Sequence, residues 1–503
     1  MRIERLVTSV LVCLSSAAAV TACDGSDTRP PPNDAGGDDA AVTPDDAAPT
    51  PDAGSGSTSL TYIPSGCSYT VVTPVVIDAQ RGSDVFGASP TTDHVHVSWA
   101  GPTDTTVAVI WRSDTGTLAS SLLIGTDQAA VAAANDATTD VARHDGHTVL
   151  YSGTTSAATA ERLHEVHVCG LTAGTTYYYR VGGVGHWSDV LSVSTGPAVG
   201  STAMWSFGVT GDSRGNDLTS GPGDDAFAIA QHRLSDRAVD FEVFTGDAVF
   251  LGTAQNLWNL WFEGTDGTFG VQDFMAHHAL MMSNGNHDLL VINYLVQFAM
   301  PQDVSAGENP DGEEWYSFDY ANAHFVVLND TVTNASTIAG AEANWLESDL
   351  SAVDRTRTPW IFAVHHQALF TCGSTHSPDT TARDAWQPIF DAHNVDIALE
   401  GHNHVYERTL PILGTTGTMA NVAPHGAMGE PTVSGGIPSG TVYVVAGGAG
   451  APLYPIDTTA CPATHTGVSE RNYMTVEIAG TSIHVTTRDT LTDAIIDEMT
   501  WTK

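Results

Sequence analysis

The sequence predicts a small all-β sandwich over residues 60–199, followed by an α/β domain over residues 200–503. In the first part, short runs of β-forming residues follow one another between Gly, Asp and Thr breaks. In the second part, apolar runs alternate with segments of helical periodicity, as they do in α/β sheets. Several of these apolar runs end in a polar cluster, which places reactive side chains at strand ends.

The N-terminus has the pattern of an export signal. Two arginines precede an apolar segment of about 15 residues, which is short for a membrane span, and small residues then lead to Cys23. We therefore expect residues 1–22 to be a signal peptide. The tetrapeptide VTAC that ends at Cys23 resembles the bacterial lipobox, which implies a lipid on this cysteine; ordinary cleavage after Ala22 is the alternative.

Composition limits the partners of the chain. Residues 23–59 consist largely of Asp, Pro, Ala, Gly and Ser without an aromatic residue, so we expect a disordered linker. The chain has 18 basic and 58 acidic residues and a formal net charge of -40, which would repel nucleic acid and anionic membrane surfaces. We expect no nucleic acid partner, and membrane contact only through a lipid on Cys23. The expected location is extracytoplasmic, either lipid-anchored to a bacterial envelope or secreted.

Four cysteines follow the linker, and an even number in an oxidising compartment predicts disulfides. Pairing Cys67 with Cys169 and Cys372 with Cys461 would keep each bridge inside one predicted domain, although three connectivities are open. None of the four has the paired spacing of a zinc site.

The first folded part contains a succession of expected strands. The segment LTAGTTYYYRVG at residues 171–182 resembles the fibronectin type III pattern, in which Leu171, Gly174 and Tyr177 would form a tyrosine corner. The histidines of this part are interpreted as strand-face residues rather than ligands. The expected strands are residues 94–99, 106–112, 121–125, 147–152, 164–171, 176–183 and 190–194.

In the second part, five apolar runs each stop at a polar cluster. Segments 341–353 and 383–393 carry apolar residues at helical spacing, which predicts strand, helix and strand in alternation. In such sheets ligands gather at the carboxyl ends of the strands. The polar clusters are Gly211-Asp212-Ser213-Arg214, Gly246-Asp247, Asn284-Gly285-Asn286-His287-Asp288, His365-His366 and Gly401-His402-Asn403-His404.

These clusters contain a mixture of metal-binding side chains. Carboxylate, amide and imidazole groups together suit Zn, Fe or Mn rather than Ca or Mg. One carboxylate can bridge two ions about 3.5–4 Å apart, the spacing of two-metal sites that act on phosphoryl groups. A Gly-Asp pair alone is usually a turn, and a lone His-x-His is usually a strand face. Five such clusters at strand ends make a purely structural interpretation of the set improbable.

The order GD, GD, GNHD, His and GHNH resembles the calcineurin-like metallophosphoesterases. Three further segments resemble, more narrowly, the purple acid phosphatase branch of that superfamily, which also carries a fibronectin-like domain ahead of its catalytic domain. These segments are WYSFDYANAHFVVLND at 315–330, NWLESDL at 344–350 and GHNHVYER at 401–408. The resemblance implies the metallophosphoesterase fold for residues 200–503, an α/β sandwich of mixed sheets flanked by helices, and a purple acid phosphatase N-terminal domain for residues 60–199.

The resemblance also implies roles for individual residues. His287 would contact phosphate or protonate the leaving group, with Asp288 orienting it. Either His365 or His366 could be the single histidine ligand; we choose His366 because it places His376 where family members have a catalytic histidine. The implied ligands are Asp212, Asp247 and His404 for a first metal, with Asp247 bridging, and Asn286, His366 and His402 for the second.

The sequence departs from the family pattern at three places. Phe250 stands where purple enzymes have a tyrosine, so the tyrosinate-to-iron colour should be absent and a divalent pair becomes as plausible as a ferric one. Arg214 stands where the family often has glycine or histidine; it could contact phosphate or pair with an acid such as Asp217. Gln367-Ala368 replaces the usual proline segment, which weakens the choice of His366.

The resemblance therefore implies an acid phosphatase-like hydrolase. It would hydrolyse phosphate monoesters by attack of a hydroxide formed at two divalent or mixed-valence transition-metal ions, Fe, Zn or Mn. The expected partner is a small phosphoester substrate. The alternatives are a phosphodiesterase or nucleotidase that uses the same site, and a surface binding protein with a retired catalytic domain.

Overall fold

The computed structural model describes residues 58–152, 159–215, 219, 221, 225–302, 314–331, 335–414, 440–461 and 463–503. The expected signal peptide, the lipid candidate Cys23 and nearly all of the expected linker lie outside the described residues. Within the described part of the chain, no helix combines the length and the apolar character needed to cross a membrane.

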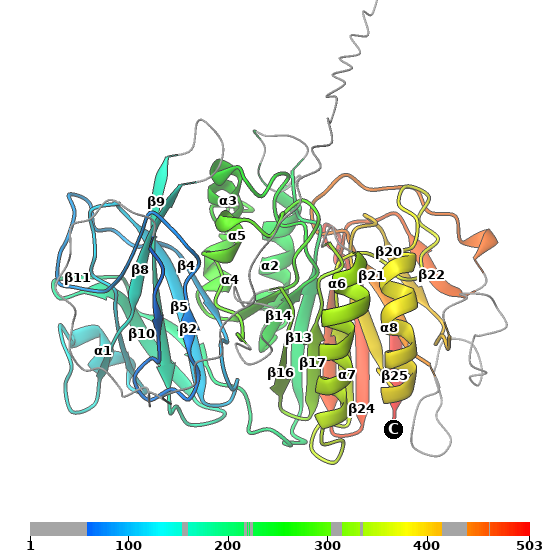
Figure 1. The fold of residues 1–503 in the computed structure, drawn as a ribbon, viewed down its shortest axis with the longest axis horizontal. Helices are drawn as coiled ribbons and strands as arrows, with labels where there is room; N and C mark the ends of the chain where they lie inside the picture. The colour runs from blue at the N-terminus through cyan, green and yellow to red at the C-terminus, as the bar shows by residue number, and fades with distance from the viewer. Residues whose placement is uncertain are drawn as a thin grey trace, which may run out of the picture. The chain divides into compact units, whose positions relative to one another are not determined.

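A mixed sheet of eleven strands among the described residues runs through both predicted domains (Figure 1). The two domains meet in this sheet, because Ala279 of β15 pairs in parallel with Val97 of β4. The strand order is β25 (Ile495–Thr502), β24 (Ser482–Asp489), β23 (Asn472–Ala479), β13 (Trp205–Thr210), β14 (Phe241–Phe244), β15 (Ala279–Met282), β4 (Asp93–Ser98), β5 (Thr106–Ser113), β9 (Ala160–Cys169), β8 (His147–Ser152) and β3 (Asp78–Arg81).

The N-terminal part is rich in β-structure, as predicted. Its second sheet packs on the first through buried residues such as Leu122 and Val181, which join the same core as Val109 and Val166. The tyrosine corner is present, because the Tyr177 hydroxyl accepts a hydrogen bond from the backbone N–H of Thr172 at 2.9 Å. The remaining elements here are β11 (His186–Trp187), β10 (Thr176–Gly183), β6 (Ser121–Gly125), β7 (Ala142–Asp145), β12 (Leu191–Ser194), the pair β1 (Thr61–Tyr62) and β2 (Val71–Val72), and α1 (Gln128–Ala133).

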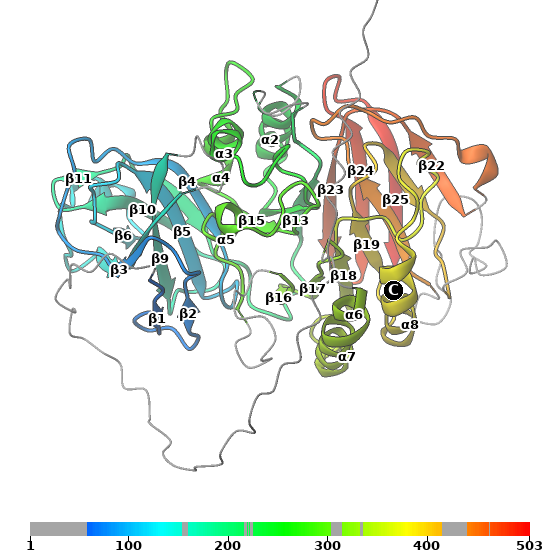
Figure 2. The ribbon, with the colours of Figure 1, turned by 45° about the horizontal axis from the view of Figure 1, so that its top comes forward.

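A seven-stranded sheet faces the eleven-stranded one in the C-terminal part (Figure 2). Aromatic rings fill the layer between them: the ring centroid of Phe207 lies 5.3 Å from that of Phe325 and 5.2 Å from that of Phe362. The strand order is β16 (Tyr316–Tyr320), β17 (Ala323–Val327), β18 (Trp360–Val364), β19 (Ile397–Glu400), β21 (Val442–Ala446), β20 (Tyr406–Thr409) and β22 (Thr464–Val468).

Helices cover the outer faces of this two-sheet sandwich. Leu346 of α7 and Phe390 of α8 pack against Ile361 and Ala398 of the seven-stranded sheet. On the other side, Leu234 of α2 lies against Gly208 of β13, where a Cβ atom would come within 2.6 Å of it. The helices are α2 (Ala226–Asp236), α3 (Gln255–Phe262), α4 (Val271–Met275), α5 (Ile292–Leu295), α6 (Ala335–Thr337), a π-helical turn (Ile338–Glu342), α7 (Ala343–Ala352) and α8 (Thr380–His393).

The predicted strands and helices of the C-terminal part are confirmed. β13, β14 and β15 are parallel neighbours in one sheet, and β18 and β19 are parallel neighbours in the other. Helix α8 begins earlier than the apolar spacing indicated, because the Asp379 carboxylate caps it by accepting from the N–H groups of Thr381 and Ala382. Since parallel strands end on the same side, the five polar clusters lie at one edge of the sandwich.

Both disulfides pair as the domain division suggested. Cys67 is bonded to Cys169 and Cys372 to Cys461, with Cα atoms 5.2 and 5.9 Å apart. The first bridge ties the N-terminal segment to the end of β9, and the second ties the segment after β18 to the segment before β22. Each bridge therefore lies within one of the predicted domains.

Candidate metal centre

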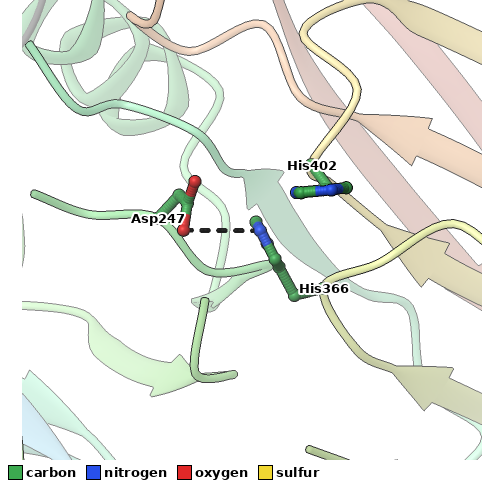
Figure 3. A group of neighbouring side chains, drawn as sticks. All are labelled: Asp247, His366 and His402. Carbon is green, nitrogen blue, oxygen red and sulfur yellow. Dashed lines mark ion pairs between the residues drawn. The ribbon is translucent and has the colours of Figure 1, made fainter. Parts of the chain in front are cut away.

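Six side chains named from the sequence follow strand ends and converge; we call them the candidate cluster. The cluster contains two sets of three ligand atoms, and within each set all atoms lie within 4.8 Å of one another. One set comes from Asp247, His366 and His402, and the other from Asp212, Asp247 and His404. Asp247 belongs to both sets, and Figure 3 shows its carboxylate directed at the His366 ring. The members are Asp212 after β13, Asp247 after β14, Asn286 after β15, His366 after β18, and His402 and His404 after β19.

The backbone of the candidate cluster is held in an unusual conformation. Asp212, Asp247 and His402 have φ angles of 54°, 59° and 66°, in the left-handed region that non-glycine residues rarely adopt. Such conformations cost about 1–3 kcal/mol each and gather at functional sites. His402 therefore does not lie in extended chain, and His402 and His404 join different sets of ligand atoms.

Glycines make close approach possible around these residues. A Cβ atom at Gly401 would lie 2.5 Å from Asp212 Oδ2, and one at Gly285 would lie 2.1 Å from the backbone nitrogen of Asp247. Among the glycines that precede the clusters, Gly246 also has a positive φ, of 94°. Gly285 and Gly401 thus admit neighbouring chain, whereas the left-handed backbone falls on Asp212, Gly246, Asp247 and His402.

The histidine tautomers favour a cation in the cluster. His366 Nδ1 donates to the carbonyl of Thr245 at 2.8 Å, and His404 Nδ1 donates to the carbonyl of Pro452 at 2.6 Å. Each Nε2 then presents a lone pair: that of His366 lies 3.0 Å from Asn286 Oδ1, and that of His404 lies 3.5 Å from an oxygen of Asp212. Acceptors that face acceptors repel unless a cation lies between them, so this donor set fits metal ions.

Burial and mutual repulsion control the protonation of the cluster. Burial lowers the pKa of His402 to about 2 and that of His404 to about 3, with neighbouring cationic groups adding to the effect, so both rings are neutral. Burial also opposes protonation of His366, but the carboxylates of Asp247 and Asp212 outweigh it and raise its pKa to about 9. Burial, and next Asp247, raise the pKa of Asp212, while His366 and Arg214 oppose this rise. In the absence of a metal, a proton on His366 Nε2 takes the place of the cation between this ring and the oxygens of Asn286 and Asp247.

Of the two adjacent histidines after β18, His366 lies in the candidate cluster and His365 lies elsewhere. His365 Nδ1 is 3.0 Å from Asp330 Oδ2, and its Nε2 is 3.5 Å from Glu400 Oε1. All three side chains are fully buried. The geometry therefore gives His365 a structural partner and leaves His366 beside Asp247.

His287 and Asp288 occupy different surroundings from those expected. The Asp288 carboxylate accepts hydrogen bonds from the backbone N–H groups of Asp247, Ala248, Val249 and Gly285. The His287 ring instead donates from Nδ1 to the carbonyl of Phe250 at 2.7 Å. Asp288 thus fixes the loop that carries Asp247, and the orienting role that the sequence suggested for it belongs to a backbone carbonyl.

His376 joins the site from the segment before α8. Its ring centroid lies 4.0 Å from that of His402. Asn403 holds this segment, because its side chain accepts from the backbone N–H of His376 and donates to the carbonyl of the same residue, both at 3.3 Å. The GHNH motif therefore contributes two histidines to the cluster and, through Asn403, positions a third.

Tyr454 is a site residue that sequence reasoning missed. Its ring stacks on that of His404 with centroids 4.0 Å apart, and its hydroxyl lies 3.4 Å from Arg214 Nη2. Arg214 Nε lies 3.4 Å from Asp247 Oδ2, while its other suggested partner, Asp217, lies outside the described residues. Nothing in the local sequence APLYPID marks Tyr454, because only a contact across 50 residues brings it to the cluster.

Known protein families match two parts of the chain. A family model described as the purple acid phosphatase N-terminal domain matches residues 92–195, and one described as calcineurin-like phosphoesterase matches residues 207–406. Purple acid phosphatase 22 of Arabidopsis thaliana is 29% identical over 49% of this chain and 54% of its own length. The Fe(3+)-Zn(2+) purple acid phosphatase 12 of the same plant is 24% identical over 50% of this chain and 53% of its own length. The chain thus spans about half the length of the curated relatives it matches.

A solved structure extends the similarity to the fold. The purple acid phosphatase PPD1 from yellow lupin (Lupinus luteus) seeds superposes with a TM-score of 0.67 at 16% identity, covering 82% of this chain and 74% of that one. At this identity the match shows the fold alone. Both halves of the domain pair, the order of the motifs and the fold agree: the chain carries a purple acid phosphatase N-terminal domain at residues 92–195, followed by a calcineurin-like phosphoesterase domain at residues 207–406.

Proposed function

We propose that this protein is a dinuclear metal-dependent phosphoesterase that hydrolyses phosphate monoesters. The observation that supports this most strongly is Asp247, whose carboxylate belongs to both sets of converging ligand atoms. A carboxylate shared between two ligand sets is the feature that a two-metal phosphoryl site needs. The names of the relatives, which are purple acid phosphatases, agree with this activity.

In this proposal the candidate cluster holds two divalent or mixed-valence transition-metal ions, Fe, Zn or Mn. Carboxylate, amide and imidazole donors suit these metals, and one relative is named for an iron and zinc pair. When bound, the ions would supply Lewis acidity toward phosphoryl oxygens and lower the pKa of water near neutrality. Asp212, Asp247 and His404 would hold the first ion, and Asp247, Asn286, His366 and His402 the second.

The protein's own groups would handle the leaving group. His287 donates from Nδ1 to the Phe250 carbonyl, so its Nε2 is the atom that can carry a proton to the departing alkoxide. His376, beside His402, would share this role. Asp288 would act through the loop of Asp247, because its four hydrogen bonds go to backbone N–H groups. It is therefore a positioning residue in this proposal.

A phosphodiesterase or nucleotidase is the second candidate, because the same ligands serve both ester types. A surface binding protein with a retired catalytic domain is disfavoured, because the six side chains expected to be ligands are all present and lie close to one another.

We also propose an extracytoplasmic location, supported by the two disulfides, which persist in oxidising compartments. Lipid attachment at Cys23, with residues 1–22 removed, remains part of this proposal. Mass spectrometry of the N-terminal peptide from membrane fractions tests it. A diacylglyceryl group on Cys23 would support anchoring, and an unmodified N-terminus after Ala22 in the medium would support secretion.

The decisive experiment measures metal content and phosphate release on the same preparation. The chain without its expected signal peptide is purified without chelators, and transition metals are counted by inductively coupled plasma mass spectrometry. About two ions per chain, with release of phosphate from an aryl monoester, is the expected result. One ion or none after reconstitution with Zn, Mn and Fe would reject the dinuclear site and favour the binding-protein alternative.

A further inference from the structure

Arg214 places a positive charge at the edge of the candidate cluster. The residue is 8% exposed, and its Nε lies 3.4 Å from Asp247 Oδ2. Among the described residues, this Nε is nevertheless without a hydrogen-bond partner. A buried guanidinium with an unused N–H is unfavourable unless an anion completes its hydrogen bonding. Arg214 is therefore suited to an anionic ligand that arrives beside Asp247.

Tyr454 extends this donor surface. Its ring is fixed between two histidines of the site: it stacks on His404 at 4.0 Å and meets His376 edge-on at 5.4 Å between ring centroids. The stacking holds the hydroxyl 3.4 Å from Arg214 Nη2. Two hydrogen-bonding groups that are not ligands of the candidate cluster thus lie together at its edge.

Arg214 and Tyr454 occupy the middle of a chain of contacts that borders the cluster. The guanidinium carbon of Arg214 lies 5.6 Å from the centre of the Phe250 ring, and this ring lies 5.5 Å from that of His287. On the other side Tyr454 leads to His376. The order is His287, Phe250, Arg214, Tyr454, His376, with the two proposed proton donors at the ends. A phosphoryl group held at the cluster would meet Arg214 and Tyr454 between these two histidines.

We infer that Arg214 and Tyr454 bind a terminal oxygen of the phosphoryl group and thereby select phosphate monoesters over diesters. This inference rests on the proposed function. A monoester dianion has three terminal oxygens and up to two negative charges, whereas a diester has two terminal oxygens and one charge. When the candidate cluster takes two terminal oxygens, the guanidinium and the phenol hydroxyl are left with the third, which a diester has replaced with an ester oxygen; the charge-assisted hydrogen bond is then lost.

The test compares two variants on two substrates. Arg214→Gln removes the charge, and Tyr454→Phe removes the hydroxyl while keeping the stack on His404. For each variant, kcat/KM is measured with an aryl phosphate monoester and with the diester of the same alcohol, alongside metal content. A hydrogen bond to a charged group predicts a loss of roughly 10- to 100-fold for the monoester in Arg214→Gln and a smaller loss, about 3- to 10-fold, in Tyr454→Phe. For the diester the loss should stay below about 3-fold in both variants.

The chain offers a matched control pair. Arg237 Nη2 lies 3.4 Å from the Tyr473 hydroxyl, the same distance as in the Arg214–Tyr454 pair, but it also forms an ion pair with Asp493 at 2.7 Å. Arg237→Gln and Tyr473→Phe should leave kcat/KM unchanged for both substrates. Equal losses on monoester and diester at unchanged metal content would overturn the inference, since Arg214 would then act on Asp247 alone.

Failure of the proposed function is distinguishable from failure of the inference. If the metal-loaded protein hydrolyses neither ester, the phosphoesterase proposal fails, and the anion site is judged by binding of inorganic phosphate. Isothermal titration should then show affinity reduced at least about 10-fold in Arg214→Gln relative to Arg237→Gln. Unchanged phosphate affinity would overturn the inference independently. If Arg214→Gln does not fold, the inference is tested with Tyr454→Phe alone, through the ratio of its kcat/KM values on the monoester and the diester.

Discussion

Two groups of histidines and carboxylates in this protein have similar composition but differ in the hydrogen-bond partners of their ring nitrogens. The candidate cluster lies at the strand ends of the C-terminal part. The second group, which we call the sandwich cluster, lies on the N-terminal sheet and consists of Tyr62, Tyr69, His147, Glu165 and His167. Both are largely buried, and both surround carboxylate with imidazole.

The two groups differ in how their lone pairs are used. In the sandwich cluster, Nδ1 of His147 and of His167 each lies 3.0 Å from a tyrosine hydroxyl, and His167 Nε2 lies 2.5 Å from Glu165. In the candidate cluster, Nε2 of His366 faces Asn286 Oδ1 and Nε2 of His404 faces Asp212 Oδ1, and both of these oxygens are acceptors. Composition therefore does not distinguish a metal site from a structural network; the presence of internal hydrogen-bond partners does.

The largest expected effect is on metal binding. Asp247→Ala should remove a ligand from both sets at once. Since loss of an outer-shell partner already lowers metal affinity about 10- to 100-fold, loss of the shared ligand should reduce phosphate release by more than about 100-fold. Metal counting and steady-state kinetics check this. Glu165→Gln, the matching change in the sandwich cluster, should keep the full metal count; retention of two metals by Asp247→Ala would break the comparison.

The two disulfides should separate stability from activity. They join residues 102 and 89 apart in sequence, and loops of this length predict a loss of roughly 4–5 kcal/mol for opening either one. Only Cys372–Cys461 lies beside the segments of His376 and Tyr454. The melting temperature should therefore fall in both Cys→Ser double variants. The kcat per folded molecule should fall only in Cys372→Ser/Cys461→Ser. Equal kcat in the two variants would contradict this separation.

His324 on β17 belongs to neither group and sharpens the comparison, because each of its ring nitrogens faces a carboxylate. Nδ1 lies 2.7 Å from Asp319 and Nε2 lies 2.8 Å from Asp349. Burial opposes its protonation, but these two carboxylates outweigh burial and raise its pKa to about 9. A raised folded-state pKa contributes stability that is fully present below pH 6.5 and is lost as pH rises toward 9.

His324 should contribute at most about 3 kcal/mol to the free energy of unfolding, as follows from the size of its pKa shift. The measurement is the difference in melting temperature between wild type and His324→Gln as a function of pH. The difference should be largest at and below pH 6.5 and should shrink toward pH 9. A constant difference over this range would mean that the His324 charge does not stabilise the fold.

The smallest expected effect is in the sandwich cluster itself. Glu165→Gln keeps the shape of the side chain but removes the charge that faces His147 and His167. A cost of about 1–3 kcal/mol is expected from disturbing a buried hydrogen-bonded group, seen as a lower melting temperature at neutral pH. His484→Gln on β24, whose side chain is 40% exposed, is the control and should change stability by no more than about 0.5 kcal/mol. A loss of metal in Glu165→Gln would place the two clusters in one functional unit.

The side chains of the candidate cluster could be named from the sequence because each follows a recognisable apolar run. Those runs form β13, β14, β15, β18 and β19, and their parallel pairing gathers the residues that follow them. The choice between His365 and His366 was harder, because both follow the same buried strand. Adjacent side chains near a strand point to opposite sides. The His365 ring accordingly meets Trp386 of α8 at 5.5 Å between centroids, and His366 meets the cluster.

Two residues could not have been assigned from local pattern. Asp288 follows His287 in sequence, but its carboxylate is used by the N–H groups of a loop 40 residues away. Tyr454 comes to the cluster only because its N–H donates to the carbonyl of His404 at 3.0 Å and its ring then stacks on that histidine. Contacts of this kind depend on which loops lie side by side, and no spacing in the chain records that.

The sequence by itself determined the strand and helix pattern and the motif order that resembles the calcineurin-like metallophosphoesterases, because these rest on periodicity and on short motifs. Tertiary structure alone decided which ring nitrogen points at which oxygen, how Arg214 and Tyr454 meet, and that one sheet continues from the C-terminal part into the N-terminal part through β15 and β4. The physical reason is that hydrogen-bond satisfaction is a property of three-dimensional neighbours. A histidine becomes a ligand or a structural residue according to the partners that folding brings to it.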